Sequence, residues 1–85
     1  MKIFISRNFE KDLNKLSDHN VKKIYTKVNE LASNQENLDI KKLKAGNEFR
    51  LRIGDYRIIF EYRSIKDETV ILLLNVFHRK DAYKK

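Results

Sequence analysis

Apolar residues follow one period in the first third of the chain and another after residue 48. In the first third they recur three or four positions apart, at Phe9, Leu13 and Leu16 and then at Val21, Ile24, Val28 and Leu31. This spacing places apolar side chains along one stripe of a helix. Ser6, and then Ser17 or Asp18, stand where side-chain N-caps are expected. The pattern predicts an amphipathic helical hairpin whose two stripes face a core.

The period becomes two in residues 49–53 and 56–62, where apolar and polar side chains alternate. Alternation of this kind is typical of strands that are buried on one face. Gly54-Asp55 lies between the two segments and predicts a two-residue turn, because glycine adopts the positive φ that such turns need. We therefore predict a β-hairpin here.

Two further segments predict strands. KIFI, residues 2–5, is short and β-prone, and VILLLNVF, residues 70–77, is a nearly continuous apolar run. Such a run is typical of a central strand that is covered on both faces. The fold class predicted is α+β: a small, antiparallel-rich sheet packed against the N-terminal helical hairpin.

The remaining segments predict loops and a tail. Residues 33–47 have no clear period and are expected to cross an edge of the domain, SIKDET (residues 64–69) to be a polar loop, and HRKDAYKK (residues 78–85) to be a basic tail with a helical turn. With 85 residues, two glycines, no proline and no cysteine, we expect one domain, residues 1–85, without disulfides. No run is long and apolar enough to span a membrane, and the start has no signal-peptide core, so we expect a cytoplasmic protein.

Positive charge is concentrated in two segments. The chain carries a net charge of +7, and residues 41–63 hold seven Lys or Arg against three Asp or Glu, a net +4. Residues 78–85 hold four against one, a net +3. Scattered charge is usual for a solvated surface, whereas concentration beside a hairpin favours a surface that faces a polyanion.

The predicted turn determines which side chains lie opposite each other in the hairpin. Arg52 falls directly across from Arg57, and Arg50 falls opposite Ile59 on the same face. Like charges placed opposite each other cost roughly 0.2 to 1 kcal/mol. Either the cluster is solvated and screened by Glu48 or Glu61, or it binds an anion, because guanidinium groups match phosphate geometry and stay charged. We call the sheet face that carries the three arginines the arginine face.

Three candidate catalytic side chains follow the last predicted strand: His78, Arg79 and Tyr83. We expect them to emerge on the same side as the arginine face. A titratable base, phosphate-binding cations and a phenol together suit attack of a ribose 2′-OH on its own phosphate. The sequence contains no zinc-ligand spacing, phosphate-binding glycine loop or Ser-His-Asp arrangement, so we expect a metal-independent reaction without a cofactor.

The order of elements and two motifs resemble the RelE group of the RelE/ParE toxin superfamily. The motifs are LKAGNEFRLRIGDYRIIFEY, residues 43–62, and HRKDAY, residues 78–83. The resemblance covers nearly the whole chain. It implies a fold similar to microbial ribonucleases and a type II toxin that enters the ribosomal A site and cuts mRNA there. It also implies a cognate antitoxin that holds the toxin inactive in a heteromeric complex.

The site residues implied by the resemblance are carried over position by position. They are the basic residues of the first hairpin strand, the arginine after the turn and the terminal motif: Arg50, Arg52, Arg57, His78, Arg79 and Tyr83. Relatives often have lysine where Arg50 and Arg52 stand. Because arginine does not release its proton, we predict His78 as the general base. Tyr83 is then an orienting, stacking or alternative acid–base group.

Two other functions remain open at this point. A toxin of the ParE kind has a similar fold but inhibits DNA gyrase and cuts no RNA. The charge distribution by itself would also suit a nucleic-acid-binding module without catalysis. The terminal His-Arg-x-x-x-Tyr motif favours the ribonuclease over both.

Overall fold

A computed structural model describes residues 1–44 and 46–81 of the chain. Its elements run in the order β1 (Ile3–Ile5), α1 (Arg7–Asn14), α2 (Asp18–Ser33), β2 (Asp39–Lys42), β3 (Glu48–Ile53), β4 (Tyr56–Ile65) and β5 (Glu68–His78), followed by a 3-10 turn (Arg79–Asp81). The five strands form one sheet in the order β1-β5-β4-β3-β2. β1 is parallel to β5, and the other neighbours are antiparallel.

Both helices begin at the predicted serine caps. The Ser6 hydroxyl accepts a hydrogen bond from the Phe9 backbone N–H at 3.0 Å, and the Ser17 hydroxyl accepts one from Asn20 N–H at 3.3 Å. Each cap satisfies a backbone donor that the first helical turn leaves unpaired. Ser17, not Asp18, is the cap of α2.

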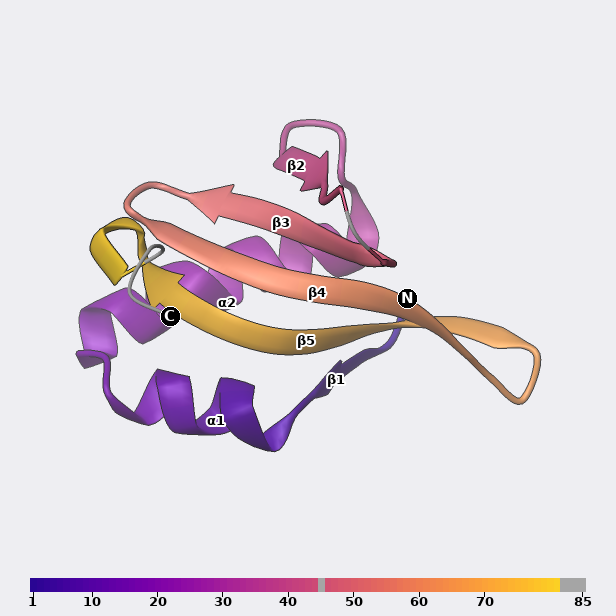
Figure 1. Cartoon of the computed structure of the whole chain (residues 1–85), viewed down its shortest axis with the longest axis horizontal. Coiled ribbons are helices and arrows are strands. Elements are labelled where there is room, and N and C mark those ends of the chain that lie inside the picture. Colours follow the sequence, from indigo (N-terminus) through magenta and orange to yellow (C-terminus); the bar gives the residue numbers. More distant parts are fainter. Residues whose placement is uncertain (45, 82–85) are drawn as a thin grey trace.

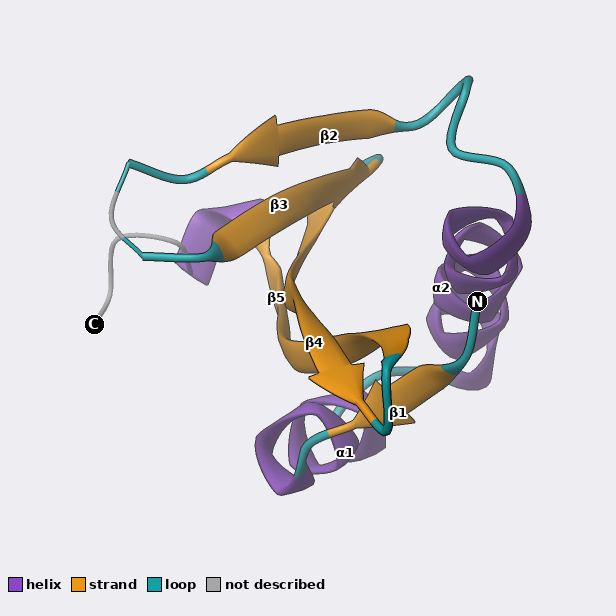
Figure 2. Cartoon of the chain, turned by 90° about the vertical axis from the view of Figure 1, so that its right-hand side faces the viewer, coloured by secondary structure: helices purple, strands orange, loops and turns teal. Residues whose placement is uncertain are grey.

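The helices pack on one face of the sheet, and within the described residues no helix covers the other face (Figures 1 and 2). The apolar stripes of α1 and α2 meet the inward-facing residues of β3, β4 and β5 in a single core cluster. Phe9, Ile24, Leu51, Phe60 and Leu73 are among its most deeply buried members. The predicted α+β class, with an antiparallel-rich sheet against a helical hairpin, is confirmed. No helix of the described residues is long and apolar enough to cross a membrane.

Two predicted loops contain regular structure. Residues 39–42 form the edge strand β2, with Ile40 opposite Leu51 of β3. The second loop is only a tight turn, because β4 extends to Ile65 and β5 begins at Glu68. Its two residues, Lys66 and Asp67, have φ of 52° and 65°. Residues other than glycine, asparagine and aspartate rarely adopt this backbone conformation. Because Lys66 is not one of them, the sequence contains no clear signal for a two-residue turn here.

A bulge in β5 reverses which of its residues face the helices. Phe60 of β4 pairs with Leu73, whereas its neighbour Ile59 pairs with Asn75, so Leu74 has no partner in the ladder. Before the bulge Ile71 and Leu73 lie in the core, and after it Val76 does. An inserted residue shifts the two-residue period by one, which moves every later side chain to the opposite face.

The first helix satisfies the backbone groups that the bulge exposes. Asp12 of α1 accepts a hydrogen bond from Val76 N–H at 3.0 Å, and the Ser6 hydroxyl donates to the Leu74 carbonyl at 2.8 Å. Ser6 therefore caps α1 and holds the bulge at once. The end of β5 then reaches the β3–β4 turn, where the 3-10 turn lies beside it (Figure 1).

Candidate functional site

The arginine face is the sheet face that the helices leave uncovered. Arg52 lies directly opposite Arg57, and Arg50 lies opposite Ile59, as the turn at Gly54-Asp55 predicted. Gly54 has a φ of 56°, which explains why the turn has glycine at this position. The predicted register of the hairpin is confirmed, including the three arginines on one face.

Arg57 is held against its own turn. Its Nη1 donates hydrogen bonds to the Gly54 and Tyr56 carbonyl oxygens, each at 2.9 Å. These two contacts use one of its terminal nitrogens. The guanidinium group is therefore oriented before any ligand arrives, which lowers the entropy lost when it binds one.

The charges around Arg57 are unbalanced. Partial burial lowers the pKa of the Arg57 guanidinium, and the positive charges of Arg52, Arg50 and Arg79 lower it further, while Asp39 acts in the opposite direction. The Asp39 Oδ1 atom lies 3.8 Å from the Arg50 Nη2 atom. An arginine stays protonated under these conditions, so the repulsion persists. A bound anion would relieve it.

A hollow of about 530 Å³ opens on this face. Its lining combines four cationic side chains with three apolar ones: Arg50, Arg57, Arg79 and Lys80, and Leu43, Ile59 and Phe77. We call it the arginine hollow. The sequence did not predict four of these lining residues as site residues: Leu43, Ile59, Phe77 and Lys80. Phe77 reaches this face only because of the bulge, which places it opposite Arg57.

Arg79 joins the hollow from the end of β5. Its backbone N–H donates to the Asp55 carbonyl oxygen at 2.7 Å, and its Nε lies 3.5 Å from the Asp55 carboxylate. These contacts tie the terminal turn to the β3–β4 hairpin. The expectation that Arg79 lies on the same side as the hairpin arginines is confirmed.

His78 lies on the opposite face, so its predicted place beside the arginines is wrong. It pairs with Tyr56 in the ladder, and both side chains lie on the helix side of the sheet. The two rings meet edge to face with centroids 5.3 Å apart. The His78 Nδ1 accepts a hydrogen bond from Lys80 N–H at 3.1 Å. An unbroken strand would have placed His78 on the arginine face, and the bulge is the reason for the difference. Tyr83 lies outside the described residues.

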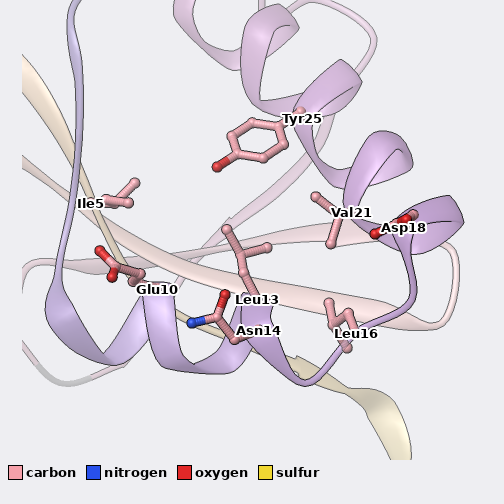
Figure 3. Close-up of a pocket in the computed structure, with 8 residues that line it drawn as sticks. All are labelled: Ile5, Glu10, Leu13, Asn14, Leu16, Asp18, Val21 and Tyr25. Carbon is pink, nitrogen blue, oxygen red and sulfur yellow. The ribbon is translucent and has the colours of Figure 1, made fainter.

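A second hollow, of about 320 Å³, lies between the two helices. Ile5 and Tyr25 stand at its rim, and each is 42% exposed. The close-up shows the side chains that surround it, which come from β1, α1, α2 and the connection between the two helices: Ile5, Glu10, Leu13, Asn14, Leu16, Asp18, Val21 and Tyr25 (Figure 3). Its only charged members are two carboxylates, which distinguishes it from the arginine hollow. Within the described residues no three histidine or carboxylate side chains are grouped closely enough to hold a metal ion.

The chain is similar to known toxins over almost its full length. A family model described as the ParE toxin of the type II toxin-antitoxin system parDE matches residues 3–83. Toxin RelE3 of Methanocaldococcus jannaschii is 36% identical, over 98% of this chain and 96% of its own.

Solved structures with the same fold include two toxin complexes. The RelB-RelE antitoxin-toxin complex from Methanococcus jannaschii contains a chain that is 34% identical with a TM-score of 0.75, and the match covers 95% of each chain. The archaeal RelE-RelB complex from Pyrococcus horikoshii gives 24% identity and a TM-score of 0.74, over 95% of this chain and 97% of that one. At 24% identity the second match shows the fold alone.

Proposed function

Because this chain belongs to the RelE/ParE superfamily of type II toxins, we propose that it is an endoribonuclease that cuts mRNA in the ribosomal A site. Cleavage there inhibits translation. The proposed reaction is metal-independent: the ribose 2′ oxygen gives up its proton and bonds to the adjacent 3′ phosphate. The bond between that phosphate and the 5′ oxygen of the next nucleotide breaks, and the 5′ oxygen takes up a proton.

The observation that carries the proposal is the composition of the arginine hollow. Four cations line the hollow together with the apolar side chains of Leu43, Ile59 and Phe77, which we take as its apolar floor. A nucleotide has the complementary parts, since its phosphate accepts hydrogen bonds from guanidinium groups and its base stacks on an aromatic ring. A surface that only solvates charge has no need of an apolar floor between its cations.

We assign the roles by position. Arg57, which is pre-oriented by the Gly54 and Tyr56 carbonyls, stabilises the charge that develops on the phosphorane. Arg50 and Arg79 line the same hollow and hold the phosphate. Arg52, opposite Arg57, holds the backbone of the message beside it. For Tyr83 we propose the role that the resemblance implies, an acid–base or stacking group.

The second candidate function is inhibition of DNA gyrase. It is favoured by one observation, the description of the matching family model as a ParE toxin. The arginine hollow argues for the ribonuclease, because a protein that only binds gyrase has no need of an oriented guanidinium beside an apolar floor.

A translation assay separates the two functions. A defined message is translated in a reconstituted system with and without the protein, and its 5′ ends are mapped. We expect new ends inside codons, and only when ribosomes are translating the message. Intact message combined with loss of supercoiling by purified gyrase would instead support the second candidate. Cleavage of naked RNA at the same rate would contradict the role of the ribosome.

We also propose a cognate antitoxin as the partner of this toxin. The proposal is supported by the similarity to a toxin from a RelB-RelE complex at 34% identity. Two surfaces suit such a partner: the arginine face would attract acidic residues, and the hollow between α1 and α2 would accept apolar ones. A flexible acidic chain that covers both would order on binding.

Co-expression with an adjacent small reading frame tests this partnership. We expect a complex that co-purifies and restores growth, and an association rate that falls as salt rises because part of the attraction is ionic. If the rate does not depend on salt, the arginine face is not part of the contact.

A further inference from the structure

The turn that follows β5 is held by His78 through one ring nitrogen. Its Nδ1 accepts a hydrogen bond from the Lys80 backbone N–H at 3.1 Å. A ring nitrogen that accepts a hydrogen bond carries no proton, so the proton of the neutral ring lies on Nε2. The contact is lost when Nδ1 carries a proton, since that nitrogen is then a donor and cannot accept from the Lys80 N–H.

The imidazole ring is itself held in place from the helix side of the sheet. It packs edge to face against Tyr56 at an interplanar angle of 82°. The Tyr56 hydroxyl accepts a hydrogen bond from Asn20 Nδ2 of α2 at 3.1 Å. The ring is thus fixed by residues of the core face, away from the arginine hollow.

His78, Arg79 and Lys80 are each held by a different contact. His78 packs on Tyr56, the Arg79 N–H donates to the Asp55 carbonyl at 2.7 Å, and the Lys80 N–H donates to His78. Arg79 and Lys80 both line the arginine hollow. The contact between Lys80 and His78 therefore sets the path of the chain along one wall of that hollow.

We propose that His78 is a positioning residue, whose Nδ1 holds the turn that presents Arg79 and Lys80 to the RNA. This replaces its predicted role as the general base. A base needs a free lone pair within reach of the 2′-OH, whereas this Nδ1 is occupied and the ring lies on the other face of the sheet. The effect on RNA cleavage rests on the function proposed above.

Three variants distinguish the two roles. In His78→Asn the side-chain oxygen can accept from the N–H two residues later, as asparagine does in Asx turns. His78→Gln places its amide one carbon further out, near the position of Nε2, and His78→Ala removes the acceptor. We expect His78→Asn to cut within about threefold of wild type, and the other two to lose up to about 10²-fold, as expected when catalytic groups are displaced by about 1 Å.

A general base predicts a different order. Asparagine cannot take up a proton, so all three variants would then lose roughly 10²- to 10⁴-fold together. His78→Asn as inactive as His78→Ala would therefore overturn the proposal. Circular dichroism of each variant confirms folding before the rates are compared.

A second measurement does not depend on cleavage. Long-range ¹⁵N–¹H NMR spectra of the isolated wild-type protein report which ring nitrogen carries the proton, and amide exchange reports the protection of Lys80. We expect the Nε2–H form of His78, and slow exchange at Lys80 that becomes fast in His78→Ala and stays slow in His78→Asn. The Nδ1–H form, or a Lys80 amide unprotected in wild type, would overturn the contact. A wild-type protein that cuts no RNA would contradict the proposed function and leave this result unaffected.

Discussion

Replacing Arg57 by alanine is the most direct test of the arginine hollow. The substitution removes a guanidinium group that Gly54 and Tyr56 hold in position and that three other arginines surround. If Arg57 stabilises the phosphorane, Arg57→Ala must lower the rate of the chemical step. If Arg57 only adds positive charge to the surface, the substitution must weaken binding of the message instead, and the difference in affinity from wild type must disappear at high salt.

The structure predicts a small loss of stability and a larger loss of rate for Arg57→Ala. Removing the two hydrogen bonds of Arg57 costs about 0.5 to 1.5 kcal/mol each, and removing the repulsion with Arg52 returns roughly 0.2 to 1 kcal/mol. We therefore expect the free energy of unfolding to fall by about 1.4 kcal/mol, and by no more than about 2.8 kcal/mol. The loss of one donor to a developing negative charge typically lowers the rate by about 10²- to 10³-fold, or about 2.7 to 4 kcal/mol.

The matched control is Arg63→Ala on the same strand. Arg63 pairs with Glu61, lies on the same face as Arg57 and is six residues, or roughly 20 Å, further along β4. Each variant removes one positive charge, so their long-range electrostatic effects are similar. The assay is single-turnover cleavage of mRNA on programmed ribosomes at saturating protein, with thermal unfolding measured in parallel.

The rate should separate the two variants. We expect Arg57→Ala to lose about two to three orders of magnitude and Arg63→Ala to stay within about threefold of wild type. Equal rates for the two variants would refute the assignment, since the effect would then be one of charge alone. A large loss of stability in Arg57→Ala would show instead that the guanidinium group maintains the turn.

Three further substitutions test the turns and the floor of the hollow. Gly54→Val should destabilise the protein by about 1 to 3 kcal/mol because the φ of Gly54 is 56°, and Gly54→Asn should lower stability less. Equal denaturation midpoints for these two variants would mean that the turn has another conformation. Lys66→Gly should raise stability by about 0.5 to 1 kcal/mol, since φ at Lys66 is 52°. A lower melting temperature would contradict this. Phe77→Leu keeps an apolar side chain but removes the aromatic ring. We expect the KM for the message to rise about fivefold or more with kcat unchanged, because a stacked base contributes about 1 to 3 kcal/mol. An unchanged KM would show that no base stacks on Phe77.

Local patterns in the sequence determined the helical hairpin and the β3–β4 hairpin. Both depend on residues close together in the chain: serine caps three positions before the donors they satisfy, and a Gly54-Asp55 turn that sets the register on both sides. Because strand side chains alternate, that register by itself was enough to place Arg50, Arg52 and Arg57 on one face. The motifs around them also identified the family.

Contacts between distant segments decided the rest of the site. The bulge in β5 is held by Ser6 and Asp12, which are 68 and 64 residues away from Leu74 and Val76. In an apolar run such as VILLLNVF every register buries similar side chains, so the alternation that locates a strand's faces is missing there. Whether Phe77 or His78 reaches the arginine face therefore depends on where α1 satisfies the backbone of β5, and only the tertiary structure contains that information.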